Sequence, residues 1–181
     1  LIPITKDMIY AAAAITEPWA CVEAAYRANY RNSVHHDGIM WIIGGDEART
    51  GYLPDSLFDR SYPQAIILTN VPLDLKFKVS QLCKAQGVSC CEMDLESALA
   101  SNGSYDDILT LDCSAQSITQ ASEKLAKRGM MVMFGENESA KIEIDLGRLH
   151  YDDIYFAGTD SLDLIEGYKR TTSRADHFPG G

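Results

Sequence analysis

The sequence has little of what marks membrane-spanning and nucleic-acid-binding proteins. No apolar segment reaches the roughly 20 residues that a bilayer-spanning helix needs. The 16 Lys and Arg residues are scattered singly among 26 Asp and Glu, and the formal net charge is −10. Nucleic acids are bound through clustered basic side chains, so this charge pattern excludes that class of partner. The first residues lack a signal-peptide layout, and we expect a soluble cytoplasmic protein.

Metal-ligand and redox spacings are also missing. The five cysteines form no Cys-x-x-Cys pair and have apolar neighbours, so we expect reduced thiols packed in a core. The histidines follow no ligand spacing, and the adjacent His35 and His36 are expected in an exposed loop. We therefore expect no metal site in this chain. The cysteines are Cys21, Cys83, Cys90, Cys91 and Cys113, and the other two histidines are His150 and His177.

Short apolar runs recur along the 181 residues and predict a sheet. Residues 39–43 are all apolar and precede paired glycines, which is typical of a strand buried on both faces of a parallel sheet. Further strands are expected at residues 65–70, 88–93, 108–112, 130–135 and 153–158, with helices at 52–60, 73–86, 95–100, 114–127 and 161–170. Residues 141–146 alternate as a half-buried strand or an extended arm should. The sequence thus predicts an α/β fold with a doubly wound parallel sheet of about six strands, a Rossmann fold.

A longer helix is predicted before the first strand. Thr16 is suited to cap it, Glu17 lies near its positive end, and Pro18 fits its first turn because proline has no N–H. This helix is expected to end near Asn32. We therefore expect a leading segment with the helix, residues 1–36, and a Rossmann-like nucleotide-binding domain, residues 37–181.

The glycines after the first strand lie where a nucleotide pyrophosphate approaches in such folds. The dinucleotide fingerprint is Gly-x-Gly-x-x-Gly, whereas here Gly44 and Gly45 are followed by the next glycine only at Gly51. Asp46 takes the second glycine position and Arg49 the third. A carboxylate repels a pyrophosphate, although a rearranged loop could bring Gly51 into the missing place. The residues alone leave a structural turn and a phosphate cradle as alternatives.

Six segments together resemble one enzyme superfamily. They are residues 16–22 (Thr-Glu-Pro-Trp-Ala-Cys-Val), 41–45 (Trp-Ile-Ile-Gly-Gly), 68–71 (Leu-Thr-Asn-Val), 105–108 (Tyr-Asp-Asp-Ile), 129–131 (Gly-Met-Met) and 154–159 (Ile-Tyr-Phe-Ala-Gly-Thr). In this combination the chain resembles the cofactor-binding domain of the medium-chain, zinc-type alcohol dehydrogenase superfamily. The most similar branch is that of sorbitol dehydrogenase and L-sorbose-1-phosphate reductase-like enzymes. The resemblance implies that residues 1–36 come from the junction with a catalytic domain whose zinc ligands are absent here.

The resemblance also assigns roles to single residues. Glu17 matches an acid that approaches the catalytic zinc, and the alternative is a carboxylate that stabilises a helix start. Asn70 lies where the family usually carries an Asp that binds the adenosine ribose. Lys76 could pair with a 2′-phosphate, so the two residues favour NADP, or mixed use of NADP and NAD. Otherwise, Asn70 only ends a strand and Lys76 is a solvated charge.

The loops after the later strands match the two ends of the cofactor. Cys113 and Ser114 match the loop on the adenosine side. Gly135, Gly158 and Thr159 match the loops near the nicotinamide. For each of these residues, ordinary turn chemistry is the alternative.

The resemblance implies an NAD(P)-binding domain of a zinc-type dehydrogenase or reductase that acts on a sugar, polyol or sugar phosphate. Such a fragment is expected to be inactive alone, and its lone carboxylate cannot hold zinc. The family often pairs through the sixth-strand edge, so a homodimer through residues 153–158 is expected. The altered glycine pattern favours an alternative, a degenerate Rossmann-like domain without cofactor that serves as a binding or assembly module.

Overall fold

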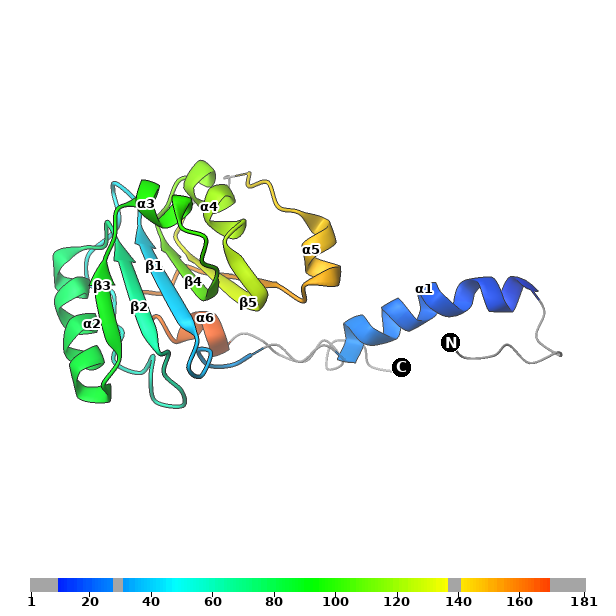
Figure 1. Cartoon of the computed structure of the whole chain (residues 1–181), viewed down its shortest axis with the longest axis horizontal. Coiled ribbons are helices and arrows are strands. Elements are labelled where there is room, and N and C mark those ends of the chain that lie inside the picture. The colour runs from blue at the N-terminus through cyan, green and yellow to red at the C-terminus, as the bar shows by residue number, and fades with distance from the viewer. Residues whose placement is uncertain (1–9, 28–30, 137–140, 170–181) are drawn as a thin grey trace. The chain divides into compact units, whose positions relative to one another are not determined.

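The structure, a computed structural model, describes residues 10–27, 31–136 and 141–169. The chain divides into two compact units, one of Leu1–Tyr30 with Thr172–Gly181 and one of Arg31–Thr171. Helix α1 (Tyr10–Arg27) belongs to the first unit, and the sheet with all other helices belongs to the second (Figure 1). Among the residues so described, no helix combines the length and apolarity that crossing a bilayer requires.

Helix α1 begins at Tyr10, in an alanine-rich stretch that could itself form helical turns, and runs through Thr16 and Pro18 without interruption. The alanines of residues 11–14 have the highest helix propensity, and they precede the predicted start at Thr16. The Thr16 hydroxyl donates a hydrogen bond back to the Ala12 carbonyl oxygen, at 3.0 Å, as a residue inside a helix does. The predicted capping role of Thr16 is therefore wrong, and Pro18 removes one hydrogen bond from inside α1.

Six parallel strands form one sheet in the order β3-β2-β1-β4-β5-β6 (Figure 1). The strands are β1 (Ile39–Gly44), β2 (Ala65–Thr69), β3 (Ser89–Glu92), β4 (Tyr105–Leu111), β5 (Leu125–Phe134) and β6 (Tyr155–Thr159). The chain winds outward from β1 to β3 and then returns to the other side of β1. The winding therefore reverses between β1 and β4, and the predicted doubly wound α/β fold is confirmed.

Both faces of the sheet are covered, so β1 is buried on both sides as predicted. Met40 and Ile42 pack into one hydrophobic cluster, together with residues of α2 and α6. Trp41 and Ile43 pack into the other, together with residues of α3 and α4. The helices of this unit are α2 (Leu73–Gln86), α3 (Leu95–Ala100), α4 (Ala115–Ser122), α5 (Leu146–Tyr151) and α6 (Glu166–Lys169).

The connection from β1 to β2 contains no helix, so the helix predicted at residues 52–60 is wrong. Leu53 pairs instead with a segment that follows β6. Its N–H donates to the Leu162 carbonyl oxygen, at 2.9 Å, and its carbonyl oxygen accepts from the Leu164 N–H, at 3.0 Å. Tyr52 beside it is fully buried. An irregular segment thus covers the sheet where the usual crossover would place a helix.

Three predictions in the second half of the chain are wrong in part. The helix expected at residues 114–127 ends at Ser122, and the chain has already joined the sheet at Lys124, whose carbonyl oxygen accepts from the Tyr105 N–H at 2.9 Å. Residues 141–145 form no strand, although Ile142 and Ile144 are half-buried and their neighbours are exposed, as the alternation predicts. Only part of the last predicted helix forms, as α6. The end predicted for it, Arg170, lies outside the described residues.

Candidate functional site

The carboxyl ends of the strands bring most of the predicted cofactor residues to one edge of the sheet. Gly44 is the last residue of β1, Asn70 directly follows β2, and Thr159 is the last residue of β6. Doubly wound sheets bind their ligands in the crevice beyond these ends, which makes this edge the candidate site. The predicted residues that lie there are Gly44, Gly45, Asn70, Cys113, Ser114, Gly135, Gly158 and Thr159.

Gly44 and Gly45 are required by the packing of neighbouring strand ends. A Cβ at Gly44 would lie 2.1 Å from the Asn70 carbonyl oxygen, and one at Gly45 would lie 2.2 Å from the Asp112 carbonyl oxygen. Both are backbone atoms that cannot move aside as a flexible side chain can. The paired glycines thus let the loops after β2 and β4 close around the end of β1. Of the two alternatives left by the sequence, this geometry favours the structural turn.

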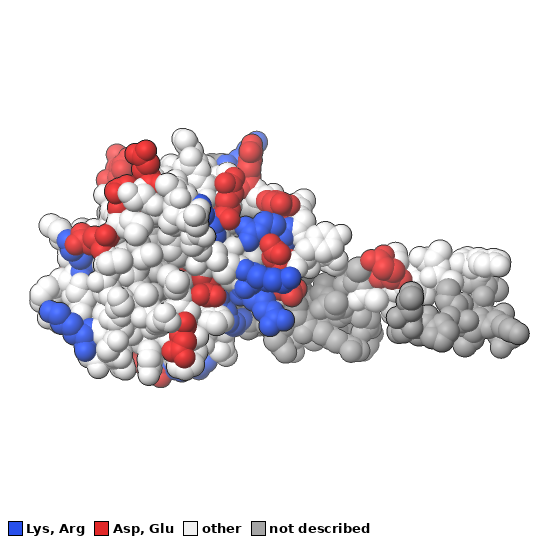
Figure 2. Space-filling view, in the orientation of Figure 1, with Lys and Arg blue, Asp and Glu red and all other residues white. Residues whose placement is uncertain are grey.

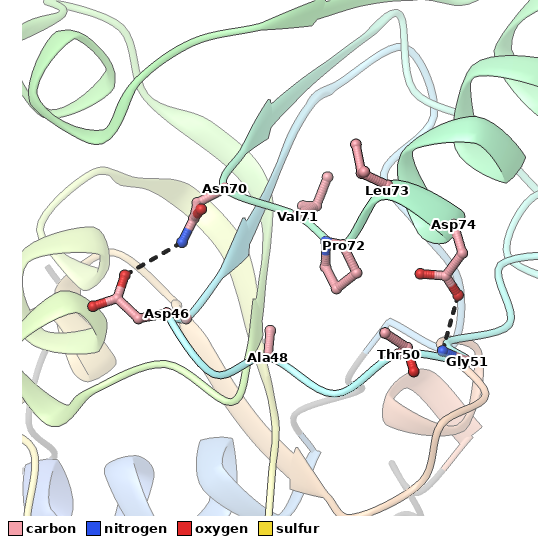
Figure 3. Close-up of a pocket in the computed structure, with 10 residues that line it drawn as sticks. Asp46, Ala48, Thr50, Gly51, Asn70, Val71, Pro72, Leu73 and Asp74 are labelled. Atoms are coloured by element: carbon pink, nitrogen blue, oxygen red, sulfur yellow. Dashed lines mark hydrogen bonds between the residues drawn. The ribbon is translucent and has the colours of Figure 1, made fainter.

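The third glycine does not return to this turn. Gly51 has a φ of +87°, and its N–H donates to the Asp74 carboxylate at 2.9 Å, in the first turn of α2 (Figure 3). This hydrogen bond lowers the pKa of Asp74. A dinucleotide fold normally presents a helix start to the pyrophosphate directly after β1. Here residues 45–64 are irregular, so that helix start is replaced by an extended loop.

Arg49 fastens this loop to the ends of two other strands. Its Nε contacts both carboxylate oxygens of Asp112, at 3.1 Å each, and its backbone N–H donates to the same carboxylate at 3.0 Å. Its Nη1 donates to Glu136, at 2.9 Å, and the Tyr52 hydroxyl donates to Asp112 at 2.7 Å. We call Arg49, Tyr52, Asp112 and Glu136 the loop latch. The latch joins the loops that follow β1, β4 and β5.

The loop latch shifts the pKa values of its members in the directions expected for an ion pair. The hydrogen bond to Asp112 raises the pKa of Arg49. Burial raises the pKa of Tyr52, and its hydrogen bond to Asp112 adds to the rise. For Asp112, burial acts to raise the pKa, but the hydrogen bonds from Arg49 and Tyr52 outweigh it and lower the pKa. Arg49 and Asp112 therefore stay charged at neutral pH.

Two grooves lie beside the loop after β1. The first, which we call the α3 groove, has a volume of about 790 Å³ and is bordered by the ends of β1, β2 and β3 and by the starts of α3 and α4. The second, the α2 groove, has about 750 Å³ and lies between the same loop and the start of α2 (Figure 3). Asp46 and Asn70 border both grooves. In the described part of the chain, no Lys, Arg or His lines either groove.

Asn70 lies at the end of β2 with a φ of +49°, in the left-handed region that asparagine tolerates. Its side-chain Nδ2 donates to the Gly44 carbonyl oxygen at 3.2 Å and lies 3.5 Å from the Asp46 carboxylate (Figure 3). Lys76 follows in the first turns of α2, where its Nζ forms an ion pair with Glu92 at 2.7 Å. Glu92 is the last residue of β3 and lines the α3 groove.

Cys113 and Ser114 lie at the switch point between β1 and β4. The Cys113 thiol donates to the Ile43 carbonyl oxygen at 3.4 Å, and burial raises its pKa to about 12. Ser114 caps α4, since its hydroxyl accepts from the Ser117 N–H at 3.1 Å. Ser114 and Ser117 both line the α3 groove.

The loops after β5 and β6 show ordinary turn contacts. The Gly135 N–H donates to the Thr159 carbonyl oxygen at 3.1 Å, and the Thr159 hydroxyl accepts from the Ser161 N–H at 3.2 Å. A Cβ at Gly158 would have no neighbour nearer than the Met133 carbonyl oxygen at 3.8 Å. Gly158 is thus not required by the local packing, unlike Gly44.

Glu17 lies on α1, in the unit that does not carry the sheet. Among residues 10–27, 31–136 and 141–169, no group of three His, Cys, Asp or Glu side chains is placed to hold a metal ion. His36 is exposed as predicted, but His35 is half-buried. Cys83 is buried and Cys90 and Cys113 are half-buried, whereas Cys91 is exposed, so the expectation of a core thiol is wrong for Cys91. His177 lies outside the described residues.

Sequence reasoning missed the acidic partners at this edge. Asp112 directly follows β4, and the sequence predicts no role for it; Arg49 is recognised from the sequence only as the residue in a glycine position. Their opposite charges at strand ends were a signal for pairing, because the carboxyl ends of parallel strands meet at one edge. Glu92 and Asp94 carried no comparable signal, because acids after a short strand are common in solvated turns.

No family model matches the chain, and a search of curated proteins finds no match. Solved structures do match its fold. A zinc-binding dehydrogenase from Sinorhizobium meliloti bound to NADP is 18% identical with a TM-score of 0.51, over 87% of this chain and 46% of that one. A cobalt- and zinc-bound thermostable alcohol dehydrogenase from Pyrobaculum aerophilum is 16% identical with a TM-score of 0.47, over 96% of this chain and 48% of that one. The chain thus spans about half the length of these proteins, and the likeness to the first shows the fold.

Proposed function

We propose that this chain is the NAD(P)-binding domain of a medium-chain, zinc-type dehydrogenase or reductase, which in its full length acts on a sugar, polyol or sugar phosphate. The observation that supports it most directly is the α3 groove. It opens at the carboxyl ends of β1, β2 and β3, beside the point where the winding of a six-stranded parallel sheet reverses. Nucleotides bind to doubly wound sheets at this place. The NADP named for the similar Sinorhizobium meliloti structure accords with the proposal.

The residues of the α3 groove suit the adenosine half of the cofactor. Asn70 offers an amide at the end of β2, and Ser114 and Ser117 offer hydroxyl groups at the start of α4. Amides and hydroxyls form hydrogen bonds with ribose hydroxyls and with the polar edge of a purine. The groove volume of about 790 Å³ suits a ligand of nucleoside size. The pyrophosphate half fits less well, because no helix starts after β1.

The bound nicotinamide supplies the hydride chemistry, and this chain binds and orients the nucleotide. On the same proposal, Gly135, Gly158 and Thr159 face the nicotinamide side. Glu17 is assigned to the acid that approaches the metal of the full-length enzyme, on the resemblance of residues 16–22. The described residues do not offer a zinc ligand set of their own, so we expect the isolated chain to be inactive.

Strand β6 supports a further part of the proposal, a homodimer through the sheet edge. Among the strands of the described residues it is the last one in the sheet, with β5 as its hydrogen-bonded neighbour. An edge strand offers its other row of backbone groups for pairing, and two-fold symmetry would join two such edges. Tyr155, Phe156 and Ala157 on this strand are only half-buried in the single chain.

A second candidate function is favoured by the loop after β1. Neighbouring backbone fills the space beside Gly44 and Gly45. Arg49 is bound by Asp112 where a phosphate-binding helix would start. These contacts would equally suit a Rossmann-like domain that has lost its cofactor and serves as a binding or assembly module. The two candidates differ in whether a nucleotide binds at all.

A fluorescence titration with NADH and NADPH separates the two candidates. Trp41 is fully buried, but its Nε1 donates to the Thr69 hydroxyl at 2.8 Å, and that hydroxyl donates to the Met93 carbonyl oxygen at 2.8 Å. Thr69 and Met93 line the α3 groove, so a ligand there would alter the Trp41 signal. The variant Trp19→Phe removes the other tryptophan of the chain, which is exposed on α1. A saturable change supports the cofactor-binding domain.

The matched control is Ser117→Phe in the same background, which fills the groove at the start of α4 without adding a tryptophan. It should abolish the saturable change while the far-ultraviolet circular dichroism stays the same. Absence of binding of either dinucleotide at millimolar concentration would defeat the first candidate and leave the second.

A further inference from the structure

Resting on the proposed function, we infer that Glu92 is a specificity-determining residue. Its carboxylate disfavours a 2′-phosphate in the α3 groove, so the groove selects NAD over NADP. The Lys76 to Glu92 ion pair carries this inference, with an Nζ to Oε2 distance of 2.7 Å. The amino group that the sequence offers for a 2′-phosphate is thus already bound to a carboxylate. That carboxylate belongs to a residue of the groove wall.

The charge of the groove points the same way. Asp46, Glu92 and Asp94 all line it, and no Lys, Arg or His is among its lining residues in the described part of the chain. Hydrogen bonds from the backbone and side chain of Ser97 lower the pKa of Asp94, so this carboxylate is ionised at neutral pH. A 2′-phosphate carries close to two negative charges at that pH, and it would be repelled by each of the three acids.

The hydrogen-bonding pattern of Asn70 fits a ribose that carries a free 2′-hydroxyl. Both hydrogens of its amide point to protein acceptors, the Gly44 carbonyl oxygen at 3.2 Å and the Asp46 carboxylate at 3.5 Å. A phosphate has no proton to donate and needs hydrogen-bond donors, but both amide hydrogens of Asn70 already point to protein acceptors. The Asn70 Oδ1 accepts no hydrogen bond from the rest of the described chain. It can therefore accept one from a hydroxyl, as can the carboxylates beside it.

The test compares Glu92→Gln with Glu96→Gln. Both remove one negative charge near the carboxyl end of β3, but Glu96 is exposed on α3 and does not line the groove. The Trp19→Phe protein is titrated with NADH and NADPH, and with AMP and adenosine 2′,5′-bisphosphate, which differ only by the 2′-phosphate. We expect the unsubstituted groove to bind NADH at least about ten-fold more tightly than NADPH. Glu92→Gln should lower the dissociation constant of NADPH about five-fold or more and leave that of NADH unchanged.

The double variant Glu92→Gln/Lys76→Gln should lose the part of the NADPH gain that comes from the freed lysine and keep the part that comes from removal of the Glu92 charge. Glu96→Gln should leave the NADH to NADPH ratio as it was. Equal affinity for the two dinucleotides in the unsubstituted protein, or a ratio that Glu92→Gln does not change, would overturn the inference while nucleotide binding stands. If none of the four nucleotides binds, the proposed function itself fails. Thermal unfolding of each variant verifies that the fold is intact.

Discussion

The glycines at this edge of the sheet differ in whether the local packing requires a glycine. Gly44 is the last residue of β1 and Gly158 is the next to last residue of β6, and both were predicted to contact the cofactor. A Cβ at Gly44 would meet the Asn70 carbonyl oxygen at 2.1 Å, whereas at Gly158 the nearest atom would be 3.8 Å away. Two glycines in similar sequence positions thus differ in structure. Packing requires Gly44, whereas Gly158 has open space beside it.

We predict that Gly44→Ala destabilises the sheet-bearing unit and that Gly158→Ala does not. In the first variant backbone must move to admit the methyl group, at a cost of about 2 kcal/mol or more. In the second, the change should stay within about 0.5 kcal/mol, since an exposed alanine fits the strand. Urea unfolding followed by circular dichroism measures both. Equal midpoints for the two variants would contradict the steric argument.

Asp112 makes the stability of the same unit depend on pH. Its pKa is lowered from the ordinary 3.8 by its hydrogen bonds to Arg49 and Tyr52, against the effect of burial. A carboxyl group with a lowered folded pKa stabilises the protein above its unfolded pKa, and that stability is lost as the pH falls through the folded pKa. The loop latch should therefore weaken below about pH 4.

We predict that Asp112→Asn lowers the free energy of unfolding at pH 7 by about 1–3 kcal/mol, because Arg49 loses its charged partner. The difference from the unsubstituted protein should shrink at pH 3, because the unfolded chain then binds a proton at Asp112 more readily than the folded chain, in which the pKa of Asp112 is lowered. Urea unfolding at both pH values measures it. Asp59→Asn is the control, since Asp59 is an exposed acid of the same β1 to β2 connection. A difference that does not depend on pH would contradict the assignment to the ionised Asp112.

At the level of elements, α4 shows how a helix end can be set by a distant side chain. Arg148 of α5 donates to the carbonyl oxygens of Ser122 and Glu123, at 3.1 and 3.2 Å, and to that of Leu125. Its Nε also forms an ion pair with Asp152 at 2.8 Å. The last carbonyl groups of a helix need such donors. The local sequence, with apolar residues continuing to Leu125 and Ala126, gave no hint of this partner and predicted a longer helix.

We predict that Arg148→Met destabilises the protein by about 2 kcal/mol, because three carbonyl groups lose a charged donor. Arg148→Lys should recover only part of this stability, since an ammonium group cannot reach three acceptors as a planar guanidinium does. Thermal unfolding of the two variants measures the effect. Lys127→Met serves as the control for removal of a basic residue nearby. A Lys variant as stable as the original would argue against the fork geometry.

For the whole molecule, the sequence was sufficient for the strands and the winding but not for the first crossover. Apolar runs at 39–43 and 65–69 are buried wherever they pack, so their hydrophobicity predicts strands without knowledge of their partners. The segment at 52–60 also contains apolar residues, but Leu53 is held by Leu162 and Leu164. The edge where ligands would bind was predictable from strand ends. The ion pairs that surround it, Arg49 with Asp112 and Lys76 with Glu92, depend on contacts across the sheet.

The surface of the sheet-bearing unit bears on its assembly. On the face shown in Figure 2, Lys and Arg are interspersed with Asp and Glu and no basic stripe is present among the coloured residues. We predict that the chain dimerises through β6, because this strand lies at the edge of the sheet in the described residues and carries half-buried apolar side chains. Sedimentation velocity should show a dimer, and Ala157→Pro should yield monomer by blocking edge pairing. A monomer at all concentrations would refute the edge dimer.

The pairing of Leu53 with Leu162 and Leu164 has a consequence for how the protein is made. The segment that joins the first two strands waits for its partners until the sixth strand has been synthesised. Tyr52, Leu57 and Phe58 of this segment pack on one side of β1 and β2, so we expect an incomplete chain to expose apolar surface there, as a substrate of chaperones does.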